Sequence, residues 1–185
     1  MHLDLGCGPF PRDGYEGVDL VPGPGVTHVV DLEKFPWKIQ RPYPASALRI
    51  DNDSVEGVFT SHLVEHITDL VGFMRELHRV CKAGAEVIIH HPYQFNVRAW
   101  QDPTHVRALN EASWFYYDKN WRASTGNTWG GYGDCDFELV ELDAIPEENW
   151  KEIANEFPEE FERACRNQVN VISDLRVLLR CRKNA

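Results

Sequence analysis

The chain lacks any run of about eighteen apolar residues, and its first residues hold neither a basic segment nor the apolar stretch of a secretion signal. These absences argue against a membrane partner and predict a cytoplasmic protein. Paired cysteine spacing is also missing, because the five cysteines are odd in number and scattered, which favours reduced thiols over a disulfide framework. Basic residues are too few, 19 Lys and Arg against 29 Asp and Glu, for nucleic acid to be the expected main partner.

The composition that is present predicts one folded domain over residues 1–185, because 43% of the residues are hydrophobic and 26% are charged. The acidic charge is concentrated in the second half of the chain. Asp134–Glu162 contains twelve acidic residues and a single basic one, Lys151. We expect residues 146–168 to form an acidic helical segment, which is either a solvated face or a docking surface for a cationic partner.

Strand-like and helix-like segments alternate along the chain, which predicts an α/β fold with a mostly parallel sheet. One helix shows an apolar stripe between His66 and Lys82, and Gly84 is placed to cap its C-terminus. The proline-containing stretch from Phe35 to Pro44 predicts a loop without regular structure. The expected strands are Leu3–Leu5, Gly17–Leu20, Val26–Asp31, Ser54–Ser61, Glu86–His90, Phe137–Leu142 and Val177–Cys181.

The first twenty residues contain the most informative local pattern. An apolar strand leads into Gly6-Cys7-Gly8, and the next short strand ends around Asp19. Glycine lets backbone N–H groups approach a ligand closely at a strand end, and a carboxylate after the next strand can accept both hydroxyls of a ribose. The combination predicts a cofactor that contains a nucleoside.

Four motifs, taken in order, resemble those of class I S-adenosylmethionine-dependent methyltransferases, in particular the small methyltransferase-11-like group. They are LDLGCG at residues 3–8, DL at 31–32, SHLVEH at 61–66 and ELHRVCKAG at 76–84. The resemblance extends to Pro92 and implies a Rossmann-like, mostly parallel seven-stranded sheet with helices on both faces. Pro9–Tyr15 leaves room for only a shortened first helix, and an aromatic insertion follows the fifth strand.

The resemblance implies S-adenosyl-L-methionine as the cofactor. Asp4 would position the cofactor's ammonium group, the Gly6–Gly8 loop would approach its methionine part, and Asp19 would bind the ribose hydroxyls. Alternatively, Asp19 and Asp31 only cap turns that precede a proline. The implied cofactor-binding residues are Asp4, Gly6, Cys7, Gly8, Asp19 and Leu20, then Asp31 and Leu32 at the adenine, and Ser61 and His62 on the reacting side.

Residues 62–66 also match a different pattern, His-x-x-Glu-His, which is the zinc signature of inverzincins. That site requires His62 and His66 on one helix. Because Val55–Ser61 predicts a strand that leads directly into His62, the sequence favours a loop at this histidine, and no metal ligand is predicted.

Residues 93–136 form the aromatic insertion, at the carboxyl edge of the sheet where open α/β folds bind ligands. They include four of the six tryptophans. This composition predicts a substrate pocket or lid, or alternatively a small satellite core in which the aromatic residues pack. Within the insertion, QDPTHVR at residues 101–107 resembles a short motif of some members of the same group.

Methyl transfer often needs a general base, and several strand-end residues are candidates for this role. The first choice is His105, with Asp102 orienting its ring, and Arg107 available for an anionic part of the substrate. A metal-assisted mechanism is a weaker alternative, because no spacing enforces ligation by Asp102, His105 and His91. The candidates for the base are His62, His66, His91, Asp102 and His105.

These observations predict a methyltransferase that acts on oxygen or nitrogen of a small-molecule or glycan acceptor, since the acidity argues against nucleic acid. The competing hypothesis is a non-catalytic module on the same fold, which holds the cofactor or binds a partner through its acidic segment. The sequence leaves the oligomeric state open.

Overall fold

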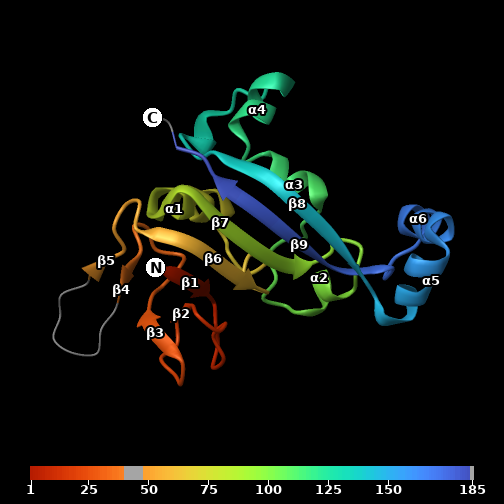
Figure 1. Cartoon of the computed structure of the whole chain (residues 1–185), viewed down its shortest axis with the longest axis horizontal. Helices are drawn as coiled ribbons and strands as arrows, with labels where there is room; N and C mark the ends of the chain where they lie inside the picture. The colour runs from red at the N-terminus through yellow and green to blue at the C-terminus, as the bar shows by residue number, and fades with distance from the viewer. Residues whose placement is uncertain (40–47, 184–185) are drawn as a thin grey trace.

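The computed structural model describes residues 1–39 and 48–183. Seven strands form its main sheet: β1 (His2–Leu5), β2 (Glu16–Asp19), β3 (Val26–Val29), β6 (Val55–Ser61), β7 (Cys81–Pro92), β8 (Phe137–Pro146) and β9 (Ile172–Cys181). Their order is β3-β2-β1-β6-β7-β9-β8 (Figure 1). The first five strands of this order are parallel, and β9 is antiparallel to both of its neighbours. The predicted Rossmann-like, mostly parallel sheet is therefore confirmed.

Two further strands, β4 (Lys38–Ile39) and β5 (Leu48–Arg49), form a separate antiparallel pair. The expectation of an irregular loop from Phe35 to Pro44 is thus wrong at β4, and residues 40–44 lie outside the described part of the chain. The helices are α1 (Leu70–Val80), α2 (Arg98–Gln101), α3 (Glu111–Phe115), α4 (Lys119–Thr125), α5 (Lys151–Glu156) and α6 (Pro158–Asn167), with 3-10 turns η1 (Gly130–Tyr132) and η2 (Glu148–Trp150). η2, α5 and α6 show that the acidic segment is largely helical.

Helix α1 begins and ends for identifiable reasons. Asp69 caps its first turn, because the Gly72 N–H donates to Asp69 Oδ1 at 2.8 Å. The apolar stripe of the helix is buried against the sheet. The helix is shorter than the sequence predicts, and Gly84 does not cap it. The backbone becomes extended at Cys81, where β7 starts by pairing with Val55, so the chain passes from helix to strand without a turn.

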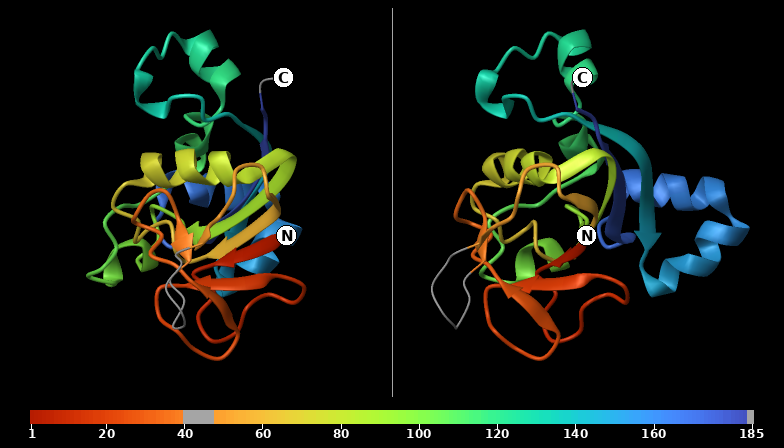
Figure 2. Two further views of the ribbon diagram at one scale, coloured as in Figure 1. Left: turned by 90° about the vertical axis from the view of Figure 1, so that its left-hand side faces the viewer. Right: turned by 60° about the vertical axis from the view of Figure 1, so that its left-hand side comes forward.

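The two faces of the sheet differ in burial. On β7, Val87, Ile89 and His91 are fully buried, whereas the alternating residues 86, 88 and 90 remain partly or largely exposed. The described helices α1 and α3 lie on the buried side, and no described helix covers the face that Figure 1 turns toward the viewer (Figure 2). The predicted helices on both faces are therefore found on one face only.

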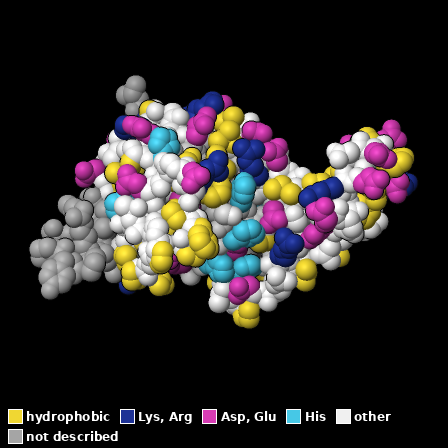
Figure 3. Space-filling model, turned by 60° about the horizontal axis from the view of Figure 1, so that its bottom comes forward, with side chains coloured by type: hydrophobic (Ala, Val, Ile, Leu, Met, Phe, Trp, Pro, Cys, Tyr) yellow, Lys and Arg dark blue, Asp and Glu magenta, His cyan; other side chains and the backbone are white. Residues whose placement is uncertain are grey.

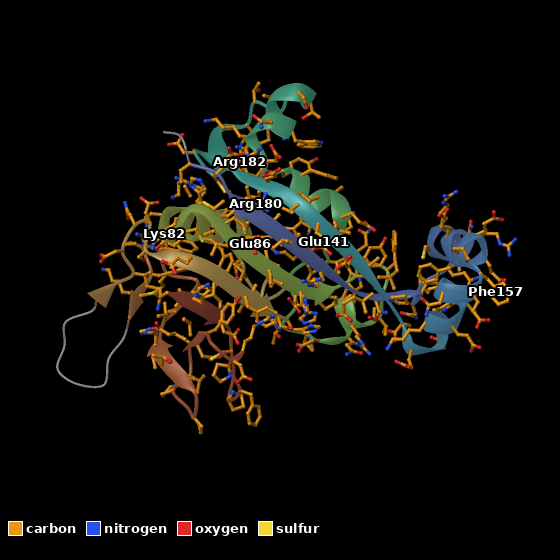
Figure 4. The ribbon with its side chains drawn as sticks, viewed as in Figure 1. Lys82, Glu86, Glu141, Phe157, Arg180 and Arg182 are labelled. Atoms are coloured by element: carbon orange, nitrogen blue, oxygen red, sulfur yellow. The ribbon has the colours of Figure 1, made fainter. Side chains whose placement is uncertain are left out.

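The connection between β1 and β2 explains much of this one-sided cover. Pro9 and Pro11 interrupt it, and it forms no helix, so even the shortened first helix is missing. Charged side chains line the uncovered face instead: Arg180 lies 3.7 Å from Glu86 and 3.7 Å from Glu138 (Figure 4). Such solvent-exposed ion pairs contribute little to stability, so this face is tolerated in water but not held together by its charges.

The aromatic residues of the insertion at residues 93–136 differ in burial. Trp114 is fully buried, whereas Trp100 and Trp129 are 65% and 60% exposed. At the far end of the sheet, α5 and α6 project away from the other helices (Figure 1). No helix in the described residues is long and apolar enough to cross a membrane.

Candidate functional site

The carboxyl end of β1 leads into a loop whose backbone requires glycine. Gly6 and Gly8 have φ angles of +70° and +56°, in the left-handed region that other residues seldom adopt. A Cβ atom on Gly8 would meet nothing within 4 Å, so this side of the loop is open to a ligand. A concavity beside the loop is lined by Gly8, Pro9, Asp19, Val21, Pro22, Gly23 and Val26.

Asp19 ties this loop to the end of β2. The Gly8 N–H donates a hydrogen bond to Asp19 Oδ2 at 2.9 Å, and the Val21 N–H donates to Oδ1 at 3.0 Å. The second bond is the turn-capping contact that the sequence offers as an alternative. Because each carboxylate oxygen accepts more than one hydrogen bond, Asp19 keeps capacity for two hydroxyl donors from a ligand.

Asp4 and Cys7 shape the loop from its buried side. Asp4 is 4% exposed, and its Oδ2 accepts a hydrogen bond from the Arg12 N–H at 2.7 Å. Burial raises the pKa of Asp4, with the Arg12 contacts opposing the rise. Burial, followed by the charges of Asp19 and Asp4, raises the pKa of Cys7 to about 11. The Cys7 thiol therefore stays protonated at neutral pH and is no nucleophile.

Asp31 follows β3, but its carboxylate already has partners. Its Oδ2 lies 2.9 Å from Lys34 Nζ, and its Oδ1 accepts a hydrogen bond from the Glu33 N–H at 3.1 Å. The bond from Lys34 lowers the pKa of Asp31, which favours the ionised form. Leu32 is buried, whereas Leu20 is 59% exposed. Asp31 thus caps a turn, as in the alternative above, and its adenine role stays a prediction.

The end of β6 places His62 close to the glycine loop. Its neighbour Leu63 packs on Gly6, where an added Cβ atom would lie 3.1 Å from Leu63 Cδ1. His62 has a φ of +53° and a side chain that is 51% exposed. Its Nδ1 lies 3.3 Å from Glu65 Oε1 and its Nε2 lies 3.6 Å from Asp174 Oδ1. The contact with Glu65 raises the pKa of His62, with burial opposing the rise and Asp174 adding to it.

The His-x-x-Glu-His pattern does not form a helical metal motif. Residues 62–66 precede α1, which begins at Leu70, so the loop predicted at His62 is observed. The ring of His66 lies 4.6 Å from that of His105, centroid to centroid, and His66 Nδ1 lies 3.0 Å from Thr104 Oγ1. The ring of His66 therefore contacts the ring of His105, which lies in the loop after α2.

Asp102 does not hold the ring of His105, so this part of the prediction is wrong. Asp102 Oδ1 accepts hydrogen bonds from the N–H and the hydroxyl of Thr104, at 2.8 and 2.7 Å, and these bonds lower the pKa of Asp102. His105 Nδ1 bonds to the Ala99 carbonyl at 3.2 Å, and its Nε2 lies 4.0 Å from Glu65 Oε1. The side chain of His105 is only 8% exposed. Asp102 bonds to Thr104 within its own turn, whereas the tertiary fold brings Glu65 close to His105.

His91 and Arg107 have structural partners. The Trp114 indole N–H donates to His91 Nε2 at 3.1 Å, and His91 Nδ1 donates to the Pro92 carbonyl at 2.9 Å. Burial lowers the pKa of His91 to about 4, so the ring is neutral at pH 7. Arg107 donates to the Thr68 carbonyl at 2.6 Å. His91 is thus a core residue and no candidate base.

Three residues of this site carry no predicted role: Glu65, Arg98 and Asp174. Of the three, only Glu65 has a local signal in the sequence, because it lies within the His-x-x-Glu-His motif. Arg98 Nη1 lies 3.6 Å from Asp174 Oδ2, and Asp174 belongs to β9, which reaches His62 only through sheet pairing. Figure 3 shows the outcome, with histidine side chains gathered beside acidic and basic ones on this face.

Comparisons with known proteins agree with this arrangement. Residues 26–89 match the family model described as a methyltransferase domain. No curated protein sequence matches the chain significantly. A chain of the complex between the Haloferax volcanii Trm112 methyltransferase activator and its methyltransferase has a TM-score of 0.59 at 17% identity, over 100% of this chain and 82% of that one. A SAM-dependent methyltransferase from Archaeoglobus fulgidus has a TM-score of 0.57 at 18% identity, over 97% and 85% of the two chains.

A third structure, an S-adenosylmethionine-dependent methyltransferase from Mesorhizobium loti, has a TM-score of 0.55 at 15% identity, over 97% of this chain and 89% of that one. These solved structures share the fold, and the family model covers the segment from β3 into β7. Both findings favour an enzyme over a non-catalytic module. The glycine loop and Asp19 lie at strand ends of this shared fold, and residues 26–89 match a methyltransferase domain.

Proposed function

We propose that this enzyme methylates an oxygen or nitrogen of a small-molecule or glycan acceptor at the ends of β6, β7 and β9. The observation that carries the proposal is the half-exposed imidazole of His62, which stands at the end of β6 in front of the buried Glu65 carboxylate. Leu63, the next residue, packs on Gly6 of the loop that we assign to the cofactor. An acceptor that reaches His62 would therefore lie beside that loop.

The cofactor supplies an electrophilic methyl group, and the residues present fit the rest of the molecule. The open side of Gly8 and its concavity suit the methionine and ribose parts, with the backbone of Gly6 and Cys7 alongside. Asp19 has acceptor capacity for both ribose hydroxyls, next to Leu20. The remaining proposed contacts are Asp4 for the ammonium group, Asp31 and Leu32 for the adenine, and Ser61 on the reacting side.

His62 is the group best placed to take the acceptor's proton. The buried Glu65 carboxylate lies 3.3 Å from Nδ1 and makes the ring more basic. Nε2 lies 3.6 Å from Asp174, beyond hydrogen-bond distance, so it is left for the acceptor. The sequence favours His105 and Asp102 as the catalytic pair. In this proposal they only position neighbouring groups, because the His105 side chain is enclosed.

The surface next to His62 combines aromatic and polar groups. Asp174 lies between His62 and Arg98, 3.6 Å from each. Arg98 belongs to α2, which also carries the exposed Trp100. An exposed aromatic ring with hydrogen-bonding neighbours suits a small polar molecule or a sugar, whereas a net charge of −10 disfavours nucleic acid. The concavity at this ring is lined by Gln94, Phe95, Asn96, Val97, Trp100, Val169 and Asn170.

Acceptor pools test the proposal directly. The purified chain is incubated with cofactor labelled in its methyl group and with separate pools of small molecules, glycans, proteins and nucleic acids. We expect label in the small-molecule or glycan pool, and mass spectrometry of the product then identifies the methylated atom. Label that enters only protein or nucleic acid would overturn the proposed acceptor class and leave the methyltransferase activity itself intact.

A further inference from the structure

Glu65 combines deep burial with polar atoms that lack partners. The residue is 2% exposed, and within the described parts of the chain neither carboxylate oxygen accepts a hydrogen bond. His62 Nδ1 approaches Oε1 alone, at 3.3 Å. Burial of an ionised carboxylate is costly unless it is paired or bound to a cation, so this side chain calls for a positive ligand.

His66 presents one defined nitrogen to a ligand. The Thr104 hydroxyl donates its only proton to Asp102 Oδ1 at 2.7 Å, because a carboxylate acts only as an acceptor. The contact of 3.0 Å between Thr104 Oγ1 and His66 Nδ1 must then use the Nδ1 proton of the histidine. In the neutral ring this leaves the lone pair on His66 Nε2.

His105 shows the same polarity through a different partner. Its Nδ1 lies 3.2 Å from the carbonyl oxygen of Ala99, which accepts and never donates, so Nδ1 carries the proton. The lone pair is on Nε2, which lies 4.0 Å from Glu65 Oε1. Metal-ligating histidines almost always donate their second ring N–H to a carboxylate, a backbone carbonyl or a water. His105 donates to a backbone carbonyl, and His66 donates to the Thr104 hydroxyl, which is itself bonded to a carboxylate.

We propose that Glu65, His66 and His105 bind a divalent first-row transition metal ion such as Zn²⁺. One ligand atom from each residue lies within 4.8 Å of the others. Two imidazoles and a carboxylate form a ligand set that suits such ions and leaves coordination positions open for water or an oxygen ligand.

The backbone holds the two halves of this site together. Glu65 and His66 follow β6, whereas His105 follows β7, and the Val106 N–H donates to the Glu65 carbonyl at 3.0 Å. The proposed site shares His66 with the helical zinc pattern but has His105 in place of His62. The proposal therefore departs from the expectation of no metal ligand, through residues that lie far apart in the sequence. The inference does not depend on the proposed acceptor.

Metal titration of chelator-treated protein tests the inference without any methyl transfer. Zn²⁺ binding is measured by calorimetry, and Co²⁺ is followed by its visible absorption. We expect one ion per chain, with Glu65→Gln, His66→Ala and His105→Ala each weakening binding by more than about 100-fold. Thr104→Val should weaken binding by about 10- to 100-fold, because it only removes the hydrogen bond that orients His66.

Two further variants serve as controls. His62→Asn and His28→Gln should bind Zn²⁺ as the wild type does, since neither residue belongs to the proposed ligand set. Thr104 is exposed, so its variant stays informative even where the ligand variants unfold, and circular dichroism in chelator checks each fold. The inference is overturned by the absence of a stoichiometric ion in the wild type. It is equally overturned if Thr104→Val binds at full strength, or if His62→Asn loses the ion.

Discussion

Two regions at the strand ends differ in how their carboxylates are hydrogen-bonded. The cofactor side comprises Asp4, the Gly6–Gly8 loop and Asp19, and the histidine side comprises His62, Glu65, His66 and His105. On the cofactor side, Asp4 and Asp19 accept backbone N–H bonds from Arg12 and Gly8 of the loop, and Asp19 accepts another from Val21. On the histidine side, Glu65 is as deeply buried as Asp4 but accepts no hydrogen bond within the described residues. The first arrangement is a preformed cradle, because its polar groups are satisfied before a ligand arrives. The second is incomplete without a proton or a cation.

The largest expected effect comes from removing the exposed imidazole on the histidine side. His62→Asn keeps a residue type that tolerates the positive φ while it removes the base. We expect turnover to fall by about 10²–10⁴ with little change in cofactor affinity. Single-turnover rates with labelled cofactor measure the first quantity and calorimetry the second. A His28→Gln variant is the matched control, and turnover of His62→Asn within a few-fold of that control would exclude His62 as the base.

A second prediction contrasts His62 with His91, the buried histidine on the neighbouring strand. The pKa of His91 is lowered by burial from its ordinary value of 6.5 to about 4, so the unfolded chain binds the proton more tightly than the folded one. Stability should therefore fall as the pH decreases from about 6.5 to about 4, by about 3 kcal/mol from this residue. Urea unfolding of wild type and His91→Gln across this range should show a flatter pH dependence in the variant. Parallel curves would show that His91 is not responsible.

The smallest effect is expected on the cofactor side. Asp19→Ala should weaken binding of S-adenosylmethionine through lost hydrogen bonds to the ribose, worth about 1.5–3 kcal/mol, or about 10- to 150-fold in affinity. Asp31→Ala is the comparison variant and should have a weaker effect, because Lys34 and the Glu33 N–H already occupy the Asp31 carboxylate. Calorimetric titration measures both. An equal loss in the two variants would show that the two carboxylates serve the cofactor alike.

The glycine loop and Asp19 are found where the sequence predicts them, because these parts are close along the chain. The glycine loop and Asp19 lie within the first twenty residues, and the conformational freedom of glycine is readable from residue type alone. Sequence reasoning fails at Asp102 and His105, where proximity in the sequence suggests a pair. The choice between Thr104 and His105 as the partner of Asp102 depends on a few ångströms of loop geometry that no spacing rule encodes.

The sequence by itself determined the positions of the seven strands of the main sheet, the glycine loop and the apolar stripe of α1, since each depends on local periodicity or on residues close together. Only the tertiary structure decided that one face of the sheet stays uncovered, that β9 carries Asp174 to His62, and that Glu65 meets His105. The reason is physical. Sheet pairing, parallel between β6 and β7 and antiparallel between β7 and β9, brings together residues that are far apart in the chain, and the hydrogen bonds available at that edge then select among competing partners.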